Sequence, residues 1–115
     1  MFIAHHNLSC SIIIDYNKLQ SYGSTNEVIN LEPLLNKFSN FNIDSVQIDG
    51  HDHEAIFNEM QSTNNGPKVI ILDTIKGFPI KAMMGRLDSH YYPPNKTNYK
   101  KYQTDINKHY ERYIC

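Results

Sequence analysis

The stretch Ile12-Ile13-Ile14-Asp15-Tyr16-Asn17-Lys18-Leu19-Gln20 decides how the rest of the chain is interpreted. A run of β-branched apolar residues ends abruptly in polar ones, which is typical of a buried parallel strand. In open α/β sheets, ligands bind at the carboxyl ends of the strands. Asn17 lies just beyond the strand predicted over residues 11–15, so its side-chain carbonyl could bind a hard cation, with a nearby backbone carbonyl as a second ligand.

Two more apolar runs end in the same way. Residues 45–48 lead into Asp49-Gly50-His51-Asp52, and residues 68–73 lead into Thr74-Ile75-Lys76-Gly77. Because helices are predicted between the runs, the strands should be joined by right-handed crossovers into one parallel sheet. The three polar ends would then lie on one rim and could converge on one ligand, such as a phosphate or diphosphate with Mg²⁺.

The segments between the runs have helical or turn patterns. The turn-forming residues over 21–26 predict an exposed loop. A helix is expected from residue 31, capped by Asn30 and with Pro33 in its first turn, and a second helix over residues 53–61. The apolar stripe of the first helix, Leu34, Leu35, Phe38 and Phe41, predicts core packing and not a cofactor site. The second helix has Ile56, Phe57 and Met60 on one face.

The predicted fold class is α/β: a partial parallel sheet of about three strands with crossover helices, plus a C-terminal helix. We expect a parallel α/β core over residues 1–77, an active-site loop over 78–95 and a tyrosine-rich helix over 96–115. Three strands make a thin core with two unpaired sheet edges. The chain is therefore expected to be one part of a larger sheet.

The bulk composition excludes some classes of protein. The chain has 115 residues, of which 40% are hydrophobic and 20% charged, as in an ordinary globular protein. A net charge of -1 gives no overall attraction to nucleic acid or to a membrane surface, and the basic C-terminal segment reads as a solvated helix face. Cys10 and Cys115 match no metal or redox spacing. Without a secretory signal or a membrane span, a cytoplasmic location is expected.

The histidines differ in what they predict. His5-His6 and the pair His51 and His53 lack a third ligand nearby in the sequence, which argues against a zinc site. His90 lies in a loop bounded by prolines after the third strand. A histidine near a phosphate-binding rim could donate a hydrogen bond to a substrate oxygen or carry a proton.

Five motifs, in order and at similar spacings, resemble the transketolase family over nearly the whole chain. They are Ala4-His5-His6, Ile14 to Gln20, Asp49-Gly50-His51-Asp52, Thr74-Ile75-Lys76-Gly77 and Ser89-His90-Tyr91. The resemblance places the chain in the later part of the family's N-terminal domain, a Rossmann-like fold that binds thiamine diphosphate, of which the chain would be about half.

The resemblance implies site residues, cofactors and partners. Asn17 and the carbonyl of Leu19 match ligands of a Mg²⁺ ion that accompanies thiamine diphosphate. Lys76 and His90 match positions against the cofactor and the substrate, with His90 catalytic. The implied reaction moves two-carbon ketol units between sugar phosphates. The implied partner is a second chain with the pyrimidine-binding domain, or a second copy in a homodimer of the complete enzyme.

The chain also departs from the family pattern. The Gly-Asp-Gly segment that gives the first cation ligand would precede Asn17 by about two dozen residues and does not occur. Phe78-Pro79 replaces Lys-Gly, and Ser89 replaces Trp before the loop histidine. Leu8-Ser9-Cys10-Ser11 replaces Leu-Asp-Asn-Leu. Since one Asn and one carbonyl bind Mg²⁺ weakly, the chain alone is expected to be inactive.

Three other interpretations stay open at this point. The chain could be a truncated, non-catalytic remnant or interaction module that pairs its open sheet edge with another protein. It could belong to a synthase of deoxyxylulose phosphate, which also uses thiamine diphosphate. It could be a flavodoxin-like module, which would bind flavin by itself.

Overall fold

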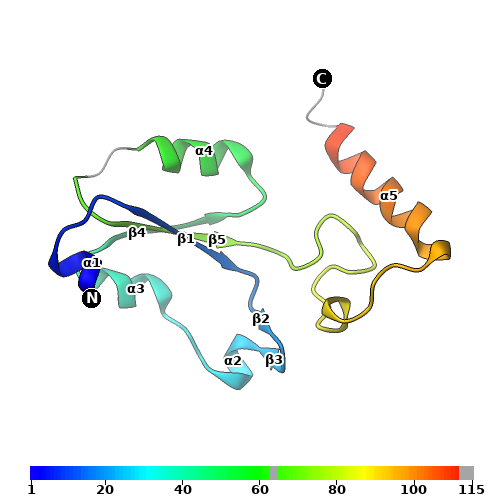
Figure 1. Ribbon diagram of the computed structural model, residues 1–115, viewed down its shortest axis with the longest axis horizontal. Coiled ribbons are helices and arrows are strands. Elements are labelled where there is room, and N and C mark those ends of the chain that lie inside the picture. The colour runs from blue at the N-terminus through cyan, green and yellow to red at the C-terminus, as the bar shows by residue number, and fades with distance from the viewer. Residues whose placement is uncertain (63–64, 112–115) are drawn as a thin grey trace.

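The computed structural model describes residues 1–62 and 65–111. Within these residues, one parallel sheet is formed by β1 (Ser11–Tyr16), β4 (Asp44–Asp49) and β5 (Lys68–Asp73) (Figure 1). The strand order is β1-β5-β4, so the last strand along the chain lies in the centre of the sheet. The predicted α/β class and parallel sheet are confirmed.

The register brings the carboxyl ends of the strands level with one another. Tyr16 pairs with Asp73, and Asp73 pairs with Asp49 on the other side. The polar residues that follow each strand therefore start from a common rim. In the described part of the chain, β1 and β4 each pair on one side only, as the sequence predicts for a partial sheet.

Helices cover both faces of the sheet. The helices α1 (Phe2–His5) and α3 (Leu34–Ser39) lie on one face, and α4 (His53–Gln61), which matches its predicted bounds, lies on the other (Figure 1). The side chains of Val69, Ile70 and Ile71 in β5 are fully buried. Because β5 is covered on both faces, its apolar run is continuous and does not alternate.

The core is concentrated on the face that α1 and α3 cover. Its buried members are Tyr16, Leu34, Ile43, Val69 and Ile71. On the α4 face, the Lys68 ammonium at the start of β5 is buried and forms an ion pair with Glu59 at 2.6 Å. Phe57 and Met60, two of the three residues predicted on one face of α4, remain 60% and 55% exposed.

The predicted exposed loop over residues 21–26 is in part regular structure. A short hairpin of β2 (Leu19–Gln20) and β3 (Gly23–Ser24) is followed by α2 (Thr25–Val28). Ser24 and Glu27 form a capping box, and Thr25 is buried. The Ser-x-x-Glu signal was present in the sequence but was obscured by the surrounding turn residues.

The helix α3 begins later than predicted. Pro33 has extended backbone geometry before Leu34, and Asn30 does not cap the helix. The side-chain oxygen of Asn30 instead accepts from the Glu32 amide at 2.9 Å, and the Glu32 carboxylate accepts from the Leu34 amide at 3.1 Å. Phe41 follows the helix and is 45% exposed, so it lies outside the apolar stripe.

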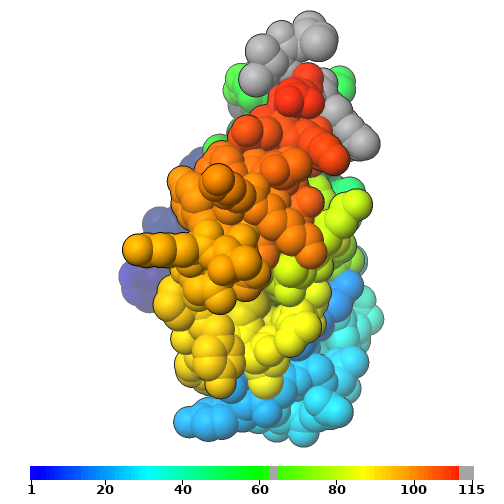
Figure 2. Space-filling model, turned by 90° about the vertical axis from the view of Figure 1, so that its right-hand side faces the viewer, coloured from blue at the N-terminus to red at the C-terminus, as the bar shows by residue number. Residues whose placement is uncertain are grey.

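After β5 the chain forms a long loop with a 3-10 turn, η1 (Asp88–His90), and then α5 (Lys96–Tyr110). The loop and α5 make up most of the face in Figure 2, with the hairpin and α2 at its lower end. None of the helical residues of α5 is buried. The last part of the helix predicted over residues 96–115, residues 112–115 with Cys115 among them, lies outside the described residues. No helix among the described residues is long and apolar enough to cross a membrane.

Candidate functional site

A cleft of about 1000 Å³ opens at the carboxyl ends of the three strands. Polar residues that follow β1, β4 and β5 line it together, as the sequence predicts from three polar strand ends on one rim. Its walls include Asn17, Lys18, Leu19, Gln47, Asp49, His51, Asp73, Thr74 and Lys76, with Phe78, Gly85 and His109 from the loop and α5. A volume of this size is ample for a cofactor-sized ligand.

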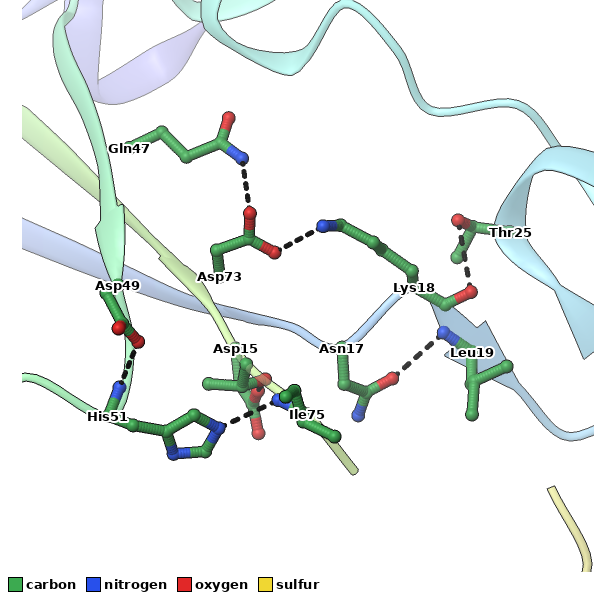
Figure 3. Close-up of polar contacts among 11 residues, drawn as sticks. Asp15, Asn17, Lys18, Leu19, Thr25, Gln47, Asp49, His51, Asp73 and Ile75 are labelled. Carbon is green, nitrogen blue, oxygen red and sulfur yellow. Dashed lines mark hydrogen bonds and ion pairs between the residues drawn. The ribbon is translucent and has the colours of Figure 1, made fainter. Parts of the chain in front are cut away.

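Asn17 and Leu19 are held in a fixed arrangement after β1. The Asn17 Oδ1 atom accepts a hydrogen bond from the Leu19 amide at 2.9 Å (Figure 3). Between them, Lys18 has a φ of 62°, which turns the chain sharply. The Lys18 carbonyl accepts from the amide of buried Thr25 at 2.9 Å, which ties this turn to α2.

The side chain of Lys18 crosses the rim to the central strand. Its ammonium lies 2.5 Å from Asp73 Oδ1, and Gln47 donates to the other oxygen of the same carboxylate at 3.4 Å (Figure 3). The hydrogen bond to Asp73 raises the pKa of Lys18 above its ordinary value. These two contacts thus connect the ends of β1, β5 and β4 through polar side chains.

A second pair of residues joins the end of β1 to the segment before α3. The hydroxyl of buried Tyr16 donates to Glu32, which raises the pKa of Tyr16. The same hydrogen bond, with a smaller contribution from the Leu34 amide, lowers the pKa of Glu32. On the other face, Thr74 donates to Asp15, which joins β1 to the end of β5.

His51 contacts the turn that follows β5. Its Nε2 atom accepts from the Ile75 amide at 2.9 Å (Figure 3), and its ring stacks on Phe78 with centroids 3.9 Å apart. The Phe78 ring also meets His109 of α5 in a T-shaped contact, with centroids 4.7 Å apart. These three rings connect β4, the loop and α5 along one wall of the cleft.

The predicted site residues divide between two adjoining spaces. Asn17, Leu19 and Lys76 line the large cleft. His90 instead lines a pocket of about 170 Å³, whose walls also include Leu19 and Lys76. The loop beside His90 is fastened to the β2–β3 hairpin, because the Tyr91 hydroxyl donates to the Ser21 carbonyl at 3.2 Å. The two spaces therefore share Leu19 and Lys76.

The donor set suits a hard cation only in part. Asn17 offers an amide oxygen that already accepts one hydrogen bond and has a second lone pair. Amide and carbonyl oxygens suit Mg²⁺, whereas the described residues contain no group of three or more His, Cys, Asp or Glu placed to hold a metal. The residues present fit part of a Mg²⁺-diphosphate site and not a complete metal cage.

Sequence reasoning missed several residues of the cleft. The sequence places His51 at a polar strand end, but its hydrogen bond to the turn after β5 has no local signal in the sequence. The link between Lys18, Gln47 and Asp73 depends on which strands are neighbours, and strand order has no local signal in the sequence. Phe78 belongs to the predicted loop over residues 78–95, but its ring contacts with His51 and His109 could not be predicted from the sequence.

Comparison with known proteins identifies related chains, although no protein-family model matches. The chain is 30% identical over 103 residues to an apulose-4-phosphate transketolase subunit of Phocaeicola vulgatus, a match that covers 87% of this chain and 37% of that protein. It is 38% identical over 79 residues to the 6-deoxy-6-sulfo-D-fructose transketolase subunit SqwG of a Clostridium species, covering 66% of this chain and 29% of that one.

Solved structures show the same fold. The crystal structure of transketolase from Campylobacter jejuni matches with a TM-score of 0.82 at 24% identity, over 92% of this chain and 17% of that one. The chain thus spans about a third of the length of the curated relatives named above.

Proposed function

Because the chain belongs to the transketolase family, we propose that it forms part of an enzyme that transfers two-carbon ketol units between sugar phosphates. Its own task would be to bind the diphosphate end of thiamine diphosphate together with Mg²⁺. The observation that carries this proposal is the convergence of three strand ends on one cleft lined by Asn17, Leu19 and Lys76.

Two oxygens would hold the cation. Asn17 Oδ1 and the carbonyl of Leu19 are hard ligands, and the hydrogen bond between these residues orients the amide group in advance. When bound, thiamine diphosphate supplies the electron sink for cleavage of a carbon–carbon bond. Lys76 would neutralise negative charge on the diphosphate or the substrate.

His90 would act on the substrate side. It shares a pocket with Lys76, so a sugar oxygen placed there could meet an imidazole and an ammonium at once. The imidazole would donate a hydrogen bond to that oxygen or transfer a proton during bond cleavage.

The chain would need a partner to complete the site. Without an acidic cation ligand, two neutral oxygens should bind a Mg²⁺-diphosphate weakly. Two of the relatives named above are called subunits of transketolases, which supports a second chain carrying the pyrimidine-binding domain. A homodimer of a complete enzyme is the other arrangement that would supply the pyrimidine-binding domain. The chain by itself would be inactive.

Titration with thiamine diphosphate and Mg²⁺ tests the proposal. The lone chain should bind with a Kd on the order of 1 mM, and its complex with the partner should bind far more tightly. In that complex, Asn17→Ala should weaken binding about tenfold, because it removes a ligand oxygen worth about 1.4 kcal/mol. The matched control is Asn58→Ala, on the exposed surface of α4.

Each other outcome has a distinct meaning. Submicromolar binding by the lone chain would contradict the incomplete site. No Mg²⁺-dependent binding in any assembly would favour a non-catalytic remnant. Flavin binding by the chain alone would favour the flavodoxin-like alternative. Formation of deoxyxylulose phosphate would favour the synthase.

A further inference from the structure

The turn that carries Lys76 contacts the imidazole of His51, and the carbonyl groups of Lys76 and Gly77 accept from the amides of Gly85 and Ile80, each at 2.9 Å. Residues 75–78 form a tight turn, in which the Phe78 amide donates to the Ile75 carbonyl at 3.1 Å. Lys76 and Gly77 are the central residues, and Gly77 has a φ of 80°. His51 contacts both ends of this turn, through the Ile75 amide and the Phe78 ring.

This geometry defines the protonation state of His51. A nitrogen that accepts from an amide N–H carries no proton, so the ring is neutral with its proton on Nδ1. Protonation would place a hydrogen on Nε2, directly opposite the Ile75 N–H. The two donors would then repel each other, and the hydrogen bond would be lost.

We propose that His51 is a positioning residue that, in its neutral form, holds the turn of residues 75–78 and keeps Lys76 in the wall of the cleft. Protonation of His51 loosens the turn, which then keeps only its backbone hydrogen bonds and its contact with the ring. Ligand binding by the cleft therefore weakens as the pH falls through the titration of this histidine. What Lys76 binds rests on the proposed function, whereas the link between His51 and the turn does not.

Charged groups from each surrounding element face the same space. Asp49 accepts from the His51 amide at 2.8 Å on its own strand end. Asp73 and Lys76 come from the end of β5, Lys18 from the end of β1 and His109 from α5, where it contacts Phe78.

Nitrogen-detected imidazole spectra of the full chain test the inference without any ligand. At neutral pH, Nε2 of His51 should resonate as an unprotonated nitrogen and Nδ1 as a protonated one. Between about pH 5 and pH 8 the Ile75 amide signal should move with the same midpoint as the His51 ring. A protonated Nε2 at neutral pH, or an Ile75 amide with no pH dependence, would overturn the proposal.

Two substitutions separate the hydrogen bond from the ring contact. His51→Gln keeps an acceptor that does not titrate, so the Ile75 amide should stay protected and lose its pH dependence. His51→Phe keeps a ring against Phe78 without an acceptor, so exchange of the Ile75 amide should rise up to about tenfold. His5→Gln, on α1, is the matched control and should leave Ile75 unchanged.

Binding completes the test. In the partner complex, affinity for thiamine diphosphate with Mg²⁺ should fall up to about tenfold more in the unmodified chain than in His51→Gln as the pH is lowered from about 8 to 5. Equal pH dependence in both would refute the positioning role. If no cofactor binds under any condition, the proposed function fails, while the spectra still decide the role of His51.

Discussion

Tyr16 and Glu32 show how one hydrogen bond near the site affects two titrations in opposite directions. The pKa of Glu32 is lowered from its ordinary 4.5, so its contribution to stability is present above about pH 4.5 and is lost as the pH falls through the lower, folded value. The pKa of Tyr16 is raised from 10.0, so its contribution is present below about pH 10 and is lost as the pH rises through the folded value.

We expect Glu32→Gln to be less stable than the unmodified chain at neutral pH, with the difference vanishing in acid below the folded pKa of Glu32. Urea unfolding at a series of pH values measures this. Tyr16→Phe serves as the control in a double-mutant cycle, because once the hydroxyl is absent the Glu32 substitution should have a smaller effect. An unchanged difference at acid pH would contradict the assignment.

For single residues, the sequence predicted the position of a side chain at the rim of the sheet more successfully than its role there. Asn17, Leu19 and Lys76 line the cleft as expected, because each follows a strand whose apolar run was unambiguous. The separate pocket of His90 depends on how a long loop folds back on the β2–β3 hairpin. Such a loop leaves no periodic signal in the sequence. The roles of all four residues stay predictions.

Gly50 connects the end of β4 to the end of β5. Its amide donates to the Asp73 carbonyl at 2.9 Å, and a β-carbon added here would lie 2.9 Å from that of Leu72 and also collide with Thr74. The backbone can therefore turn toward His51 only because this position has no side chain.

Gly50→Ala should lower the free energy of unfolding by about 1–3 kcal/mol, since the added methyl group forces the two strand ends apart. Gly23→Ala is the control, because its added carbon would meet Val28 at an ordinary 3.4 Å. Chemical denaturation of both variants gives the comparison. Equal stability of the two would show that the strand ends separate without cost.

Helices and strands were predicted correctly where the length of a segment, the spacing of its apolar residues and its terminal residues all indicated the same element. The strand over residues 68–73 and the helix over residues 53–61 have their predicted bounds, the helix because Asp52 caps it by accepting from two backbone amides. The start of α3 was predicted too early, since Glu32 itself supplies the acceptor that Asn30 was expected to supply. Strand order could not be predicted, because it is decided by packing between elements that are far apart in sequence.

As a whole, the molecule is more open than a self-contained domain of its length. Its radius of gyration is 17.2 Å and its accessible surface is 8427 Å². A compact protein of this size has a radius of about 13 Å and a surface of about 6,500 Å². The excess reflects the thin layer of sheet and helices and the separate position of α5 (Figure 1). Much of this surface would be covered in the proposed assembly.

This architecture predicts that the lone chain does not unfold as one unit. A 15-residue helix with no buried residue is marginally stable, so amides of α5 should exchange with opening free energies of about 0–1 kcal/mol. The amides of β5, which are hydrogen-bonded on both sides and buried, should report the global stability and exceed α5 by at least about 2 kcal/mol. Native-state hydrogen exchange measures both. Equal protection of α5 and β5 would show that the ring contact between Phe78 and His109 couples the helix fully to the sheet. A rise in the protection of α5 amides on adding the partner chain would locate the partner's contact at this helix.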